Sequence, residues 1–204
     1  MLSVSWNNLG KRFGLKWIFR NLQGEIPAGS HVVIKGNNGS GKSTFGKLLV
    51  GATDATKGDM IWSYDGELIK VDDIPQRIAW SAPFMEVNEE MKIREVIEFH
   101  NKFREGWNLN SFIELLNTAG LKSYNEAQIK TLSSGQKQRL RLILALGTKA
   151  NLVVLDEPCS NLDSSGIQWY GEELLKLVKK TTVVVCSNNR PEEHLGNATE
   201  IHLS

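Results

Sequence analysis

The chain has 204 residues, of which 41% are hydrophobic and 23% are charged, and its formal net charge is +1. This length suits one large or two small compact domains, and the composition excludes a disordered or fibrous chain. The nearly balanced charge indicates no broad basic face, so we expect no nucleic acid among its partners.

The cysteines and the N-terminus indicate the compartment. Cys159 and Cys186 are too few for a disulfide framework, and Met1–Val4 does not begin a secretory signal. No apolar stretch approaches the roughly 18 to 20 residues that a membrane-spanning helix needs. We therefore expect a cytoplasmic protein that would serve a membrane only from its cytoplasmic face.

The first third of the chain reads as strands joined by turns. Apolar alternation predicts strands at Leu2–Leu9, Trp17–Ile26, His31–Lys35, Asp59–Tyr64 and Leu68–Val71. Asp65-Gly66 separates the last two strands, and this pair is typical of a tight hairpin. A single helix, Lys42–Val50, follows a glycine-rich loop directly.

After a further strand at Arg77–Ser81, the chain is first helical and then alternating. Apolar spacing predicts helices at Lys92–Arg104, Ser111–Thr118 (capped by Gly120), Ser134–Gly147 (largely buried) and Ser164–Lys179. Strands are predicted at Leu152–Leu155, Thr182–Cys186 and near Glu200–Leu203. Short apolar strands separated by helices indicate a parallel sheet covered on both faces. The fold class is therefore α/β, with a helical insertion at about residues 84–132.

The glycine-rich loop matches the phosphate-loop pattern in full: Gly36, Asn37, Asn38, Gly39, Ser40, Gly41, Lys42, Ser43, followed by Thr44. Glycines let successive backbone N–H groups point at phosphate oxygens, and the following helix adds the positive end of its dipole. Lys42 supplies charge to the β- and γ-phosphates, and the Ser43 hydroxyl is the expected Mg²⁺ ligand. The alternative is a plain turn between strand and helix. We predict that the loop binds ATP with Mg²⁺.

Two acids end the strand at Leu152–Leu155. In an open parallel sheet, ligands bind at the carboxyl ends of strands, where the phosphate loop also lies. Asp156 can therefore hold Mg²⁺, directly or through water, and Glu157 can act as general base for an attacking water. Without the phosphate loop, two acids at the end of a strand would be interpreted as part of a solvated loop.

A second anion site is predicted at Leu132-Ser133-Ser134-Gly135-Gln136, before a helix. Ser133 or Ser134 could instead serve only as a helix N-cap. One chain would hardly need two phosphate sites for one nucleotide. Two copies facing head to tail would resolve this, because each would cover the ATP of the other.

These motifs, with Leu152–Pro158 and the following Ser160-Asn161-Leu162-Asp163, resemble the ATPase domain of ABC transporters in order and spacing. The resemblance covers essentially the whole chain, residues 1–204, as a single domain. It implies a P-loop NTPase core with an N-terminal antiparallel β subdomain and a helical subdomain. It also implies a separate transmembrane permease subunit, contacted by the helical insertion.

The resemblance implies further roles for single residues. Phe13 would stack on adenine, with Trp17 as the nearby rival and core packing as the alternative for either. Ser134 and Gly135, with Gln136, would contact the nucleotide held by the second copy. Asp163 would lie in the loop that crosses the dimer interface, although it could be a helix N-cap.

Two expected side chains are missing. Members of the family carry a glutamine after the strand at Arg77–Ser81, where this chain has Ala82 or Pro83. Gln76 precedes that strand and so lies on the wrong side of it to substitute. Glu86 and Asn88 are polar candidates slightly later in the chain. The family's histidine after Thr182–Cys186 is replaced by Asn188, which can donate a hydrogen bond but cannot carry charge. The four histidines, at 31, 100, 194 and 202, fall elsewhere.

We expect an ATP-hydrolysing subunit of an importer or exporter, with slow or partner-dependent turnover. Two alternatives remain open at this point. One is a soluble ABC-type ATPase that acts on ribosomes or DNA. The other is a nucleotide-gated assembly module with little hydrolysis.

Overall fold

A computed structural model describes residues 1–103 and 109–203. The chain forms two sheets, and the first is antiparallel, in the order β2-β1-β4-β5. Its strands are β1 (Leu2–Phe13), β2 (Lys16–Ile26), β4 (Lys57–Tyr64) and β5 (Glu67–Ile69). β1 continues past its predicted end through a bulge at Asn8, whose φ is 51°. Gly58 permits this, because a Cβ there would lie 2.3 Å from the Asn8 carbonyl oxygen.

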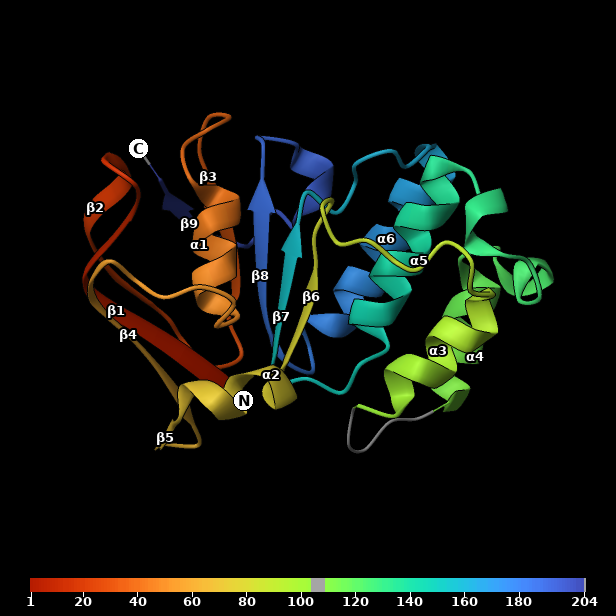
Figure 1. Cartoon of the computed structure of the whole chain (residues 1–204), viewed down its shortest axis with the longest axis horizontal. Helices are drawn as coiled ribbons and strands as arrows, with labels where there is room; N and C mark the ends of the chain where they lie inside the picture. The colour runs from red at the N-terminus through yellow and green to blue at the C-terminus, as the bar shows by residue number, and fades with distance from the viewer. Residues whose placement is uncertain (104–108, 204) are drawn as a thin grey trace.

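The second sheet is parallel, in the order β6-β7-β8-β3-β9. Its strands are β3 (His31–Lys35), β6 (Ile78–Ser81), β7 (Leu152–Asp156), β8 (Thr182–Ser187) and β9 (Thr199–His202). β7 and β8 are buried along their whole length, as expected for central strands with both faces covered. Their carboxyl ends lie along one edge of the molecule (Figure 1).

Alternate residues of the central strands face two different cores. Leu152 and Val154 of β7 pack with α1 (Lys42–Leu49) and the antiparallel sheet. Val153 and Leu155 pack with α5 (Ser134–Leu146) and α6 (Ser164–Leu177). Figure 1 shows α1 on one side of the parallel sheet and these two helices on the other. The period-two alternation of a strand therefore places the parallel sheet as the middle layer.

The helical side is completed by α3 (Ile93–Asn101) and α4 (Leu109–Thr118). Short 3₁₀ turns occur at η1 (Val71–Asp73), η2 (Lys122–Tyr124), η3 (Ile129–Thr131) and η4 (Pro191–Glu193), and the one-turn α2 spans Ile74–Arg77. Elements α3, α4, η2 and η3 all lie within the predicted insertion. In the described part of the chain, no helix has the length and apolarity to cross a membrane.

The predicted fold class is confirmed, but several boundaries were wrong. The strand predicted at Leu68–Val71 ends at Ile69, because Val71 starts a 3₁₀ turn. Arg77 belongs to α2 rather than to a strand, and Lys92 is the N-cap of α3 rather than its first residue. α3 ends at Asn101, and Arg104 lies outside the described residues.

Candidate nucleotide site

The phosphate loop joins the end of β3 to the start of α1, at the carboxyl edge of the parallel sheet (Figure 1). Lys42 is only 5% exposed. Its Nζ donates to the carbonyl oxygens of Gly36, at 2.8 Å, and Asn37, at 3.0 Å. The ammonium is therefore held across the loop, while the first amides of α1 remain without helical partners.

The loop needs its glycines for two separate reasons. Gly39 and Gly41 have φ of 85° and 98°, in the left-handed region that disfavours a side chain. A Cβ at Gly36 would lie 2.4 Å from Ser40 Oγ, and one at Gly41 would lie 2.4 Å from Ile18 Cγ2 of β2. The loop is therefore packed tightly against itself and against the antiparallel sheet.

Asp156 and Ser43 meet at the base of this loop. Asp156 is 2% exposed, and its Oδ1 is buried with no hydrogen-bond partner among the described residues. Burial raises the pKa of Asp156, while a hydrogen bond with Ser43 opposes that shift. A carboxylate oxygen without a partner, beside a hydroxyl, is the hard-oxygen donor set that Mg²⁺ prefers. The residues present therefore fit a magnesium ion.

Glu157 is held in a fixed position directly after β7. Its φ is 46°, an uncommon value for a residue with a side chain, and its amide donates to the Cys186 carbonyl at 2.9 Å. Asn188 Nδ2 donates to its Oε1 at 2.5 Å, and Ser160 Oγ donates to its Oε2 at 3.3 Å. The structure thus brings together two predicted catalytic residues, Glu157 and Asn188, which lie 31 positions apart.

The second predicted anion site lies at the same edge, on the helical side of the molecule and away from the phosphate loop (Figure 1). Ser133 is the N-cap of α5, and its Oγ accepts from the Gln136 amide at 3.2 Å. The Gln136 Oε1 accepts from the Ser133 amide at 2.9 Å, which completes a capping box. Gly135 lies against the next loop, where a Cβ would come within 2.9 Å of the Asn161 carbonyl oxygen.

The profile of the ABC transporter family matches residues 19–160 of this chain. The chain belongs to the ABC transporter family. It is an ATPase of that family, with the P-loop fold that the sequence predicts and with ATP as its ligand. The match extends from β2 to the loop after Glu157, so it includes the phosphate loop, the capped helix α5 and both acids.

Two relatives of this chain are named as ATP-binding proteins. The chain is 30% identical over 198 residues to the lantibiotic transport ATP-binding protein SrtF of Streptococcus pyogenes, covering 93% of this chain and 82% of that protein. It is 27% identical over 174 residues to the cytochrome c biogenesis ATP-binding export protein CcmA of Escherichia coli O6:H1 (strain CFT073), covering 85% and 83%.

Solved ABC proteins share the fold. A dimeric ATP-binding cassette in a post-hydrolysis state, bound to ADP and Pi, has a TM-score of 0.83 at 22% identity and covers 98% of this chain and 94% of its own. A bacterial Atm1-family ABC exporter with ATP bound has a TM-score of 0.84 at 21% identity, and this chain spans 37% of that longer one.

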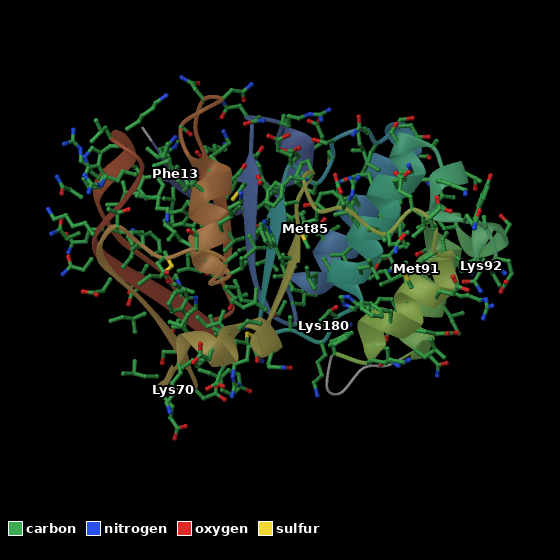
Figure 2. The ribbon with its side chains drawn as sticks, in the orientation of Figure 1. Phe13, Lys70, Met85, Met91, Lys92 and Lys180 are labelled. Atoms are coloured by element: carbon green, nitrogen blue, oxygen red, sulfur yellow. The ribbon has the colours of Figure 1, made fainter. Side chains whose placement is uncertain are left out.

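Phe13 and Trp17, the two candidates for an ABC adenine contact, have different surroundings. Trp17 lies against Gly10, where a Cβ would be 2.9 Å from its ring, and the Arg12 and Arg20 guanidinium groups lie 5.6 and 5.4 Å from its centroid. Phe13 is 56% exposed at the end of β1. In the view of Figure 2, Phe13 lies toward the same edge of the molecule as the end of α1 that the phosphate loop enters. Phe13 is the more available ring.

Asp163 is the N-cap of α6, which is the alternative left open by the sequence. It accepts from the Gly166 amide at 2.9 Å and from Arg139 Nη2 at 2.5 Å. These two contacts, the amide first, lower the pKa of Asp163. Arg139 also donates to the Ala119 carbonyl at 2.9 Å, so it connects α5, α6 and the end of α4.

The positions of the missing ABC glutamine carry no polar side chain. Ala82 is fully buried and Pro83 is exposed, while Glu86 and Asn88 are exposed further along. Gln76 lies in α2, before β6 begins.

The histidines lie away from the position where the family has its histidine. His31 lies at the start of β3, and burial lowers its pKa to about 4. His100 Nε2 contacts Thr148 Oγ1 at 2.9 Å, and His202 contacts Glu200 at 3.2 Å. His194 Nδ1 lies 3.2 Å from the carbonyl oxygen of its neighbour Leu195.

Gln138 is a site residue that sequence reasoning missed. It is fully buried on α5, and its Nε2 donates to the Pro158 carbonyl at 2.9 Å. Its Oε1 accepts from Arg141 Nη1 at 2.6 Å. It therefore ties the capped helix to the loop that follows Glu157. A polar residue on the buried face of a leucine-rich helix was the available signal, because such groups are buried only with partners.

Proposed function

We propose that this chain is the nucleotide-binding subunit of an ABC exporter, in which two copies close head to tail around ATP and drive a separate membrane subunit. The observation that carries the catalytic part is the Glu157 carboxylate, fixed by Asn188 at 2.5 Å beside the Asp156–Ser43 pair. A fixed carboxylate at the mouth of a phosphate loop is positioned to accept a proton from an attacking water.

The phosphate loop supplies the binding energy for the nucleotide. The amides of residues 36–44 and the Lys42 ammonium would hold the phosphates. Ser43 and Asp156 would hold Mg²⁺, which neutralises charge on the β- and γ-phosphate oxygens when bound. Phe13 would stack on the adenine.

The separation of the two anion-binding segments supports closure by a second copy. The phosphate loop and the N-terminus of α5 lie apart from each other along the same edge of one molecule (Figure 1). Ser134, Gly135 and Gln136 of each copy would meet the γ-phosphate held by the other copy. Asn161 and Asp163, beside Gly135, would then lie at the interface.

A groove of about 510 Å³ lies between the parallel sheet and the helical side, and its lining includes Trp80, Met85, Met91, Phe99 and Arg141. Figure 2 shows Met85 and Met91 along this boundary. Burial lowers the pKa of Arg141, and the side chain donates to the neutral amide oxygen of Gln138 at 2.6 Å. A partner with an apolar helix and an acidic side chain would complement this groove, and we assign it to the membrane subunit at the cytoplasmic face. The names of SrtF and CcmA support transport and export.

A second candidate is a nucleotide-gated assembly module with little hydrolysis. Asn188 and the Ala82-Pro83 pair favour it, because neither position offers a group that can exchange a proton.

Phosphate release and ATP-induced dimerisation, measured on the wild type and on Glu157→Gln, test the proposal. We expect the wild type to release phosphate slowly, and Glu157→Gln to abolish release and accumulate an ATP-dependent dimer in size-exclusion chromatography. An assembly module would give the same ATP-dependent dimer in both proteins, with no phosphate release from either. Copurification with a membrane protein encoded beside this chain tests the transport part.

A further inference from the structure

Lys11 contacts the ring that we assign to the nucleotide base. It lies in β1, two residues before Phe13, and is only 8% exposed. Its Nζ lies 5.1 Å from the centroid of the Phe13 ring. A cation within about 6 Å of a ring centroid is attracted by the ring quadrupole. The exposed Phe13 side chain therefore has a buried cation as one of its neighbours.

The Lys11 ammonium is anchored by the loop between α1 and β4. Its Nζ donates to Thr53 Oγ1 at 2.7 Å and to the Asp54 carbonyl at 2.6 Å. The same loop is attached to β1 where the Thr56 amide donates to the Gly10 carbonyl at 2.8 Å. Both acceptors lie in the loop between α1 and β4, which is separate from the strand that carries Phe13. They therefore fix the ammonium independently of the Phe13 ring.

The antiparallel pair of β1 and β2 also contacts the phosphate loop. Lys11 lies opposite Phe19 in the β1–β2 register. The Phe19 ring would lie 3.0 Å from a Cβ at Gly41, and it packs edge-on against Phe45 of α1 at 6.2 Å. Phe13 therefore belongs to a strand, β1, that is held in place relative to the phosphate loop through its partner strand β2.

We propose that Lys11 is a positioning residue for the nucleotide base, which holds the Phe13 ring from one side and leaves its exposed surface to stack on adenine. This inference rests on the proposed ATP site. A cation beside an aromatic ring withdraws electron density from it, which favours stacking of an electron-rich base on the remaining surface. Phe13 is 56% exposed, so such surface is available.

Equilibrium binding of MgATP and of magnesium tripolyphosphate, which has no base, separates this role from a general structural one. We expect Phe13→Ala to weaken ATP binding about tenfold, as the loss of one base–aromatic stack does. We expect Lys11→Met to weaken ATP binding about threefold, and Lys11→Arg to stay close to the wild type. Tripolyphosphate binding should be unchanged in every variant.

The double variant and a matched control complete the test. In the Phe13→Ala background, Lys11→Met should cause no further loss, because the ring through which it acts is gone. Lys57→Met removes an exposed lysine opposite Gly10 on the neighbouring strand, and it should bind as the wild type does. Should Lys11→Met not fold, Thr53→Val removes one anchor and leaves the charge, with a smaller loss for ATP alone.

Three results would overturn the inference. They are an equal loss of ATP and tripolyphosphate, a further loss in the Phe13→Ala background, and unchanged ATP binding in folded Lys11→Met or, if that variant does not fold, in Thr53→Val. A wild-type protein that binds neither ligand would instead refute the ATP site, and this inference with it.

Discussion

Replacing Asn188 by alanine should slow ATP hydrolysis without weakening ATP binding. Asn188 Nδ2 lies 2.5 Å from Glu157 Oε1, whereas the other contact of that carboxylate, Ser160, is at 3.3 Å. A hydrogen bond to a charged group contributes roughly 1.5–3 kcal/mol. Because Asn188 is partly exposed, we take the lower end, about 1.5 kcal/mol, which corresponds to a roughly tenfold change in rate.

The assay is steady-state phosphate release, with ATP and ADP affinities measured separately. We expect Asn188→Ala to lower kcat about tenfold and to change KM by less than about twofold, because the amide acts on the base and not on the nucleotide. Asn197→Ala, the same substitution at an exposed position before β9, serves as the control and should be unchanged.

Two results would contradict this reasoning. Unchanged kcat in Asn188→Ala would show that Glu157 needs no partner. A change in the ratio of ATP to ADP affinity would show that Asn188 acts on the γ-phosphate instead. Asn188→His keeps an N–H donor and adds a titrating group, so it should add an acid limb near pH ~6.5 to the pH–rate profile.

Three further predictions concern stability and the missing glutamine. Because burial raises the pKa of Asp156, the charged carboxylate destabilises the folded protein at pH values above its ordinary pKa. Asp156→Asn should therefore raise the Tm of nucleotide-free protein at pH ~7, and this gain should disappear in acid. The same variant should weaken Mg²⁺-dependent ATP binding. Gly147→Ala would place a Cβ 2.4 Å from the Phe112 ring, so thermal melts should show a loss of about 1–3 kcal/mol, against no loss for Gly171→Ala, which has open space. Pro83→Gln should raise kcat at least about twofold if this position lacks only the amide, and an unchanged kcat would contradict that.

The sequence was sufficient for the features that are local in the chain. The phosphate loop and the acid pair are contiguous motifs whose chemistry depends on their own backbone, so their residues could be predicted together. The parallel sheet followed from fully apolar strands such as β7. The assignment of the site residues to their roles, and of the whole chain to a single domain, stays a prediction.

The sequence was insufficient where distant segments or irregular backbone decide the structure. The first strand was predicted to end at Leu9, before Gly10, yet β1 continues to Phe13 because a bulge absorbs Asn8 opposite Gly58. α2 was missed because one helical turn carries no periodic signal. The contact of Lys11 with Thr53 joins residues 42 positions apart. Nothing in the local sequence around either residue indicates this contact.

The buried polar contacts of α5 join two segments of the proposed site, the N-terminus of α5 and the loop that follows Glu157. Gln138 reaches the Pro158 carbonyl, directly after Glu157, and Gly135 lies against Asn161 in the same loop. The helix that would meet the ATP of a second copy is thus attached to the loop that follows Glu157, the proposed base for the chain's own ATP. A displacement of α5 on the proposed dimer closure would therefore be transmitted to that loop, because a buried amide cannot lose its partner without a cost of about 1–3 kcal/mol. This attachment would give a physical reason for the proposed dependence of hydrolysis on a partner.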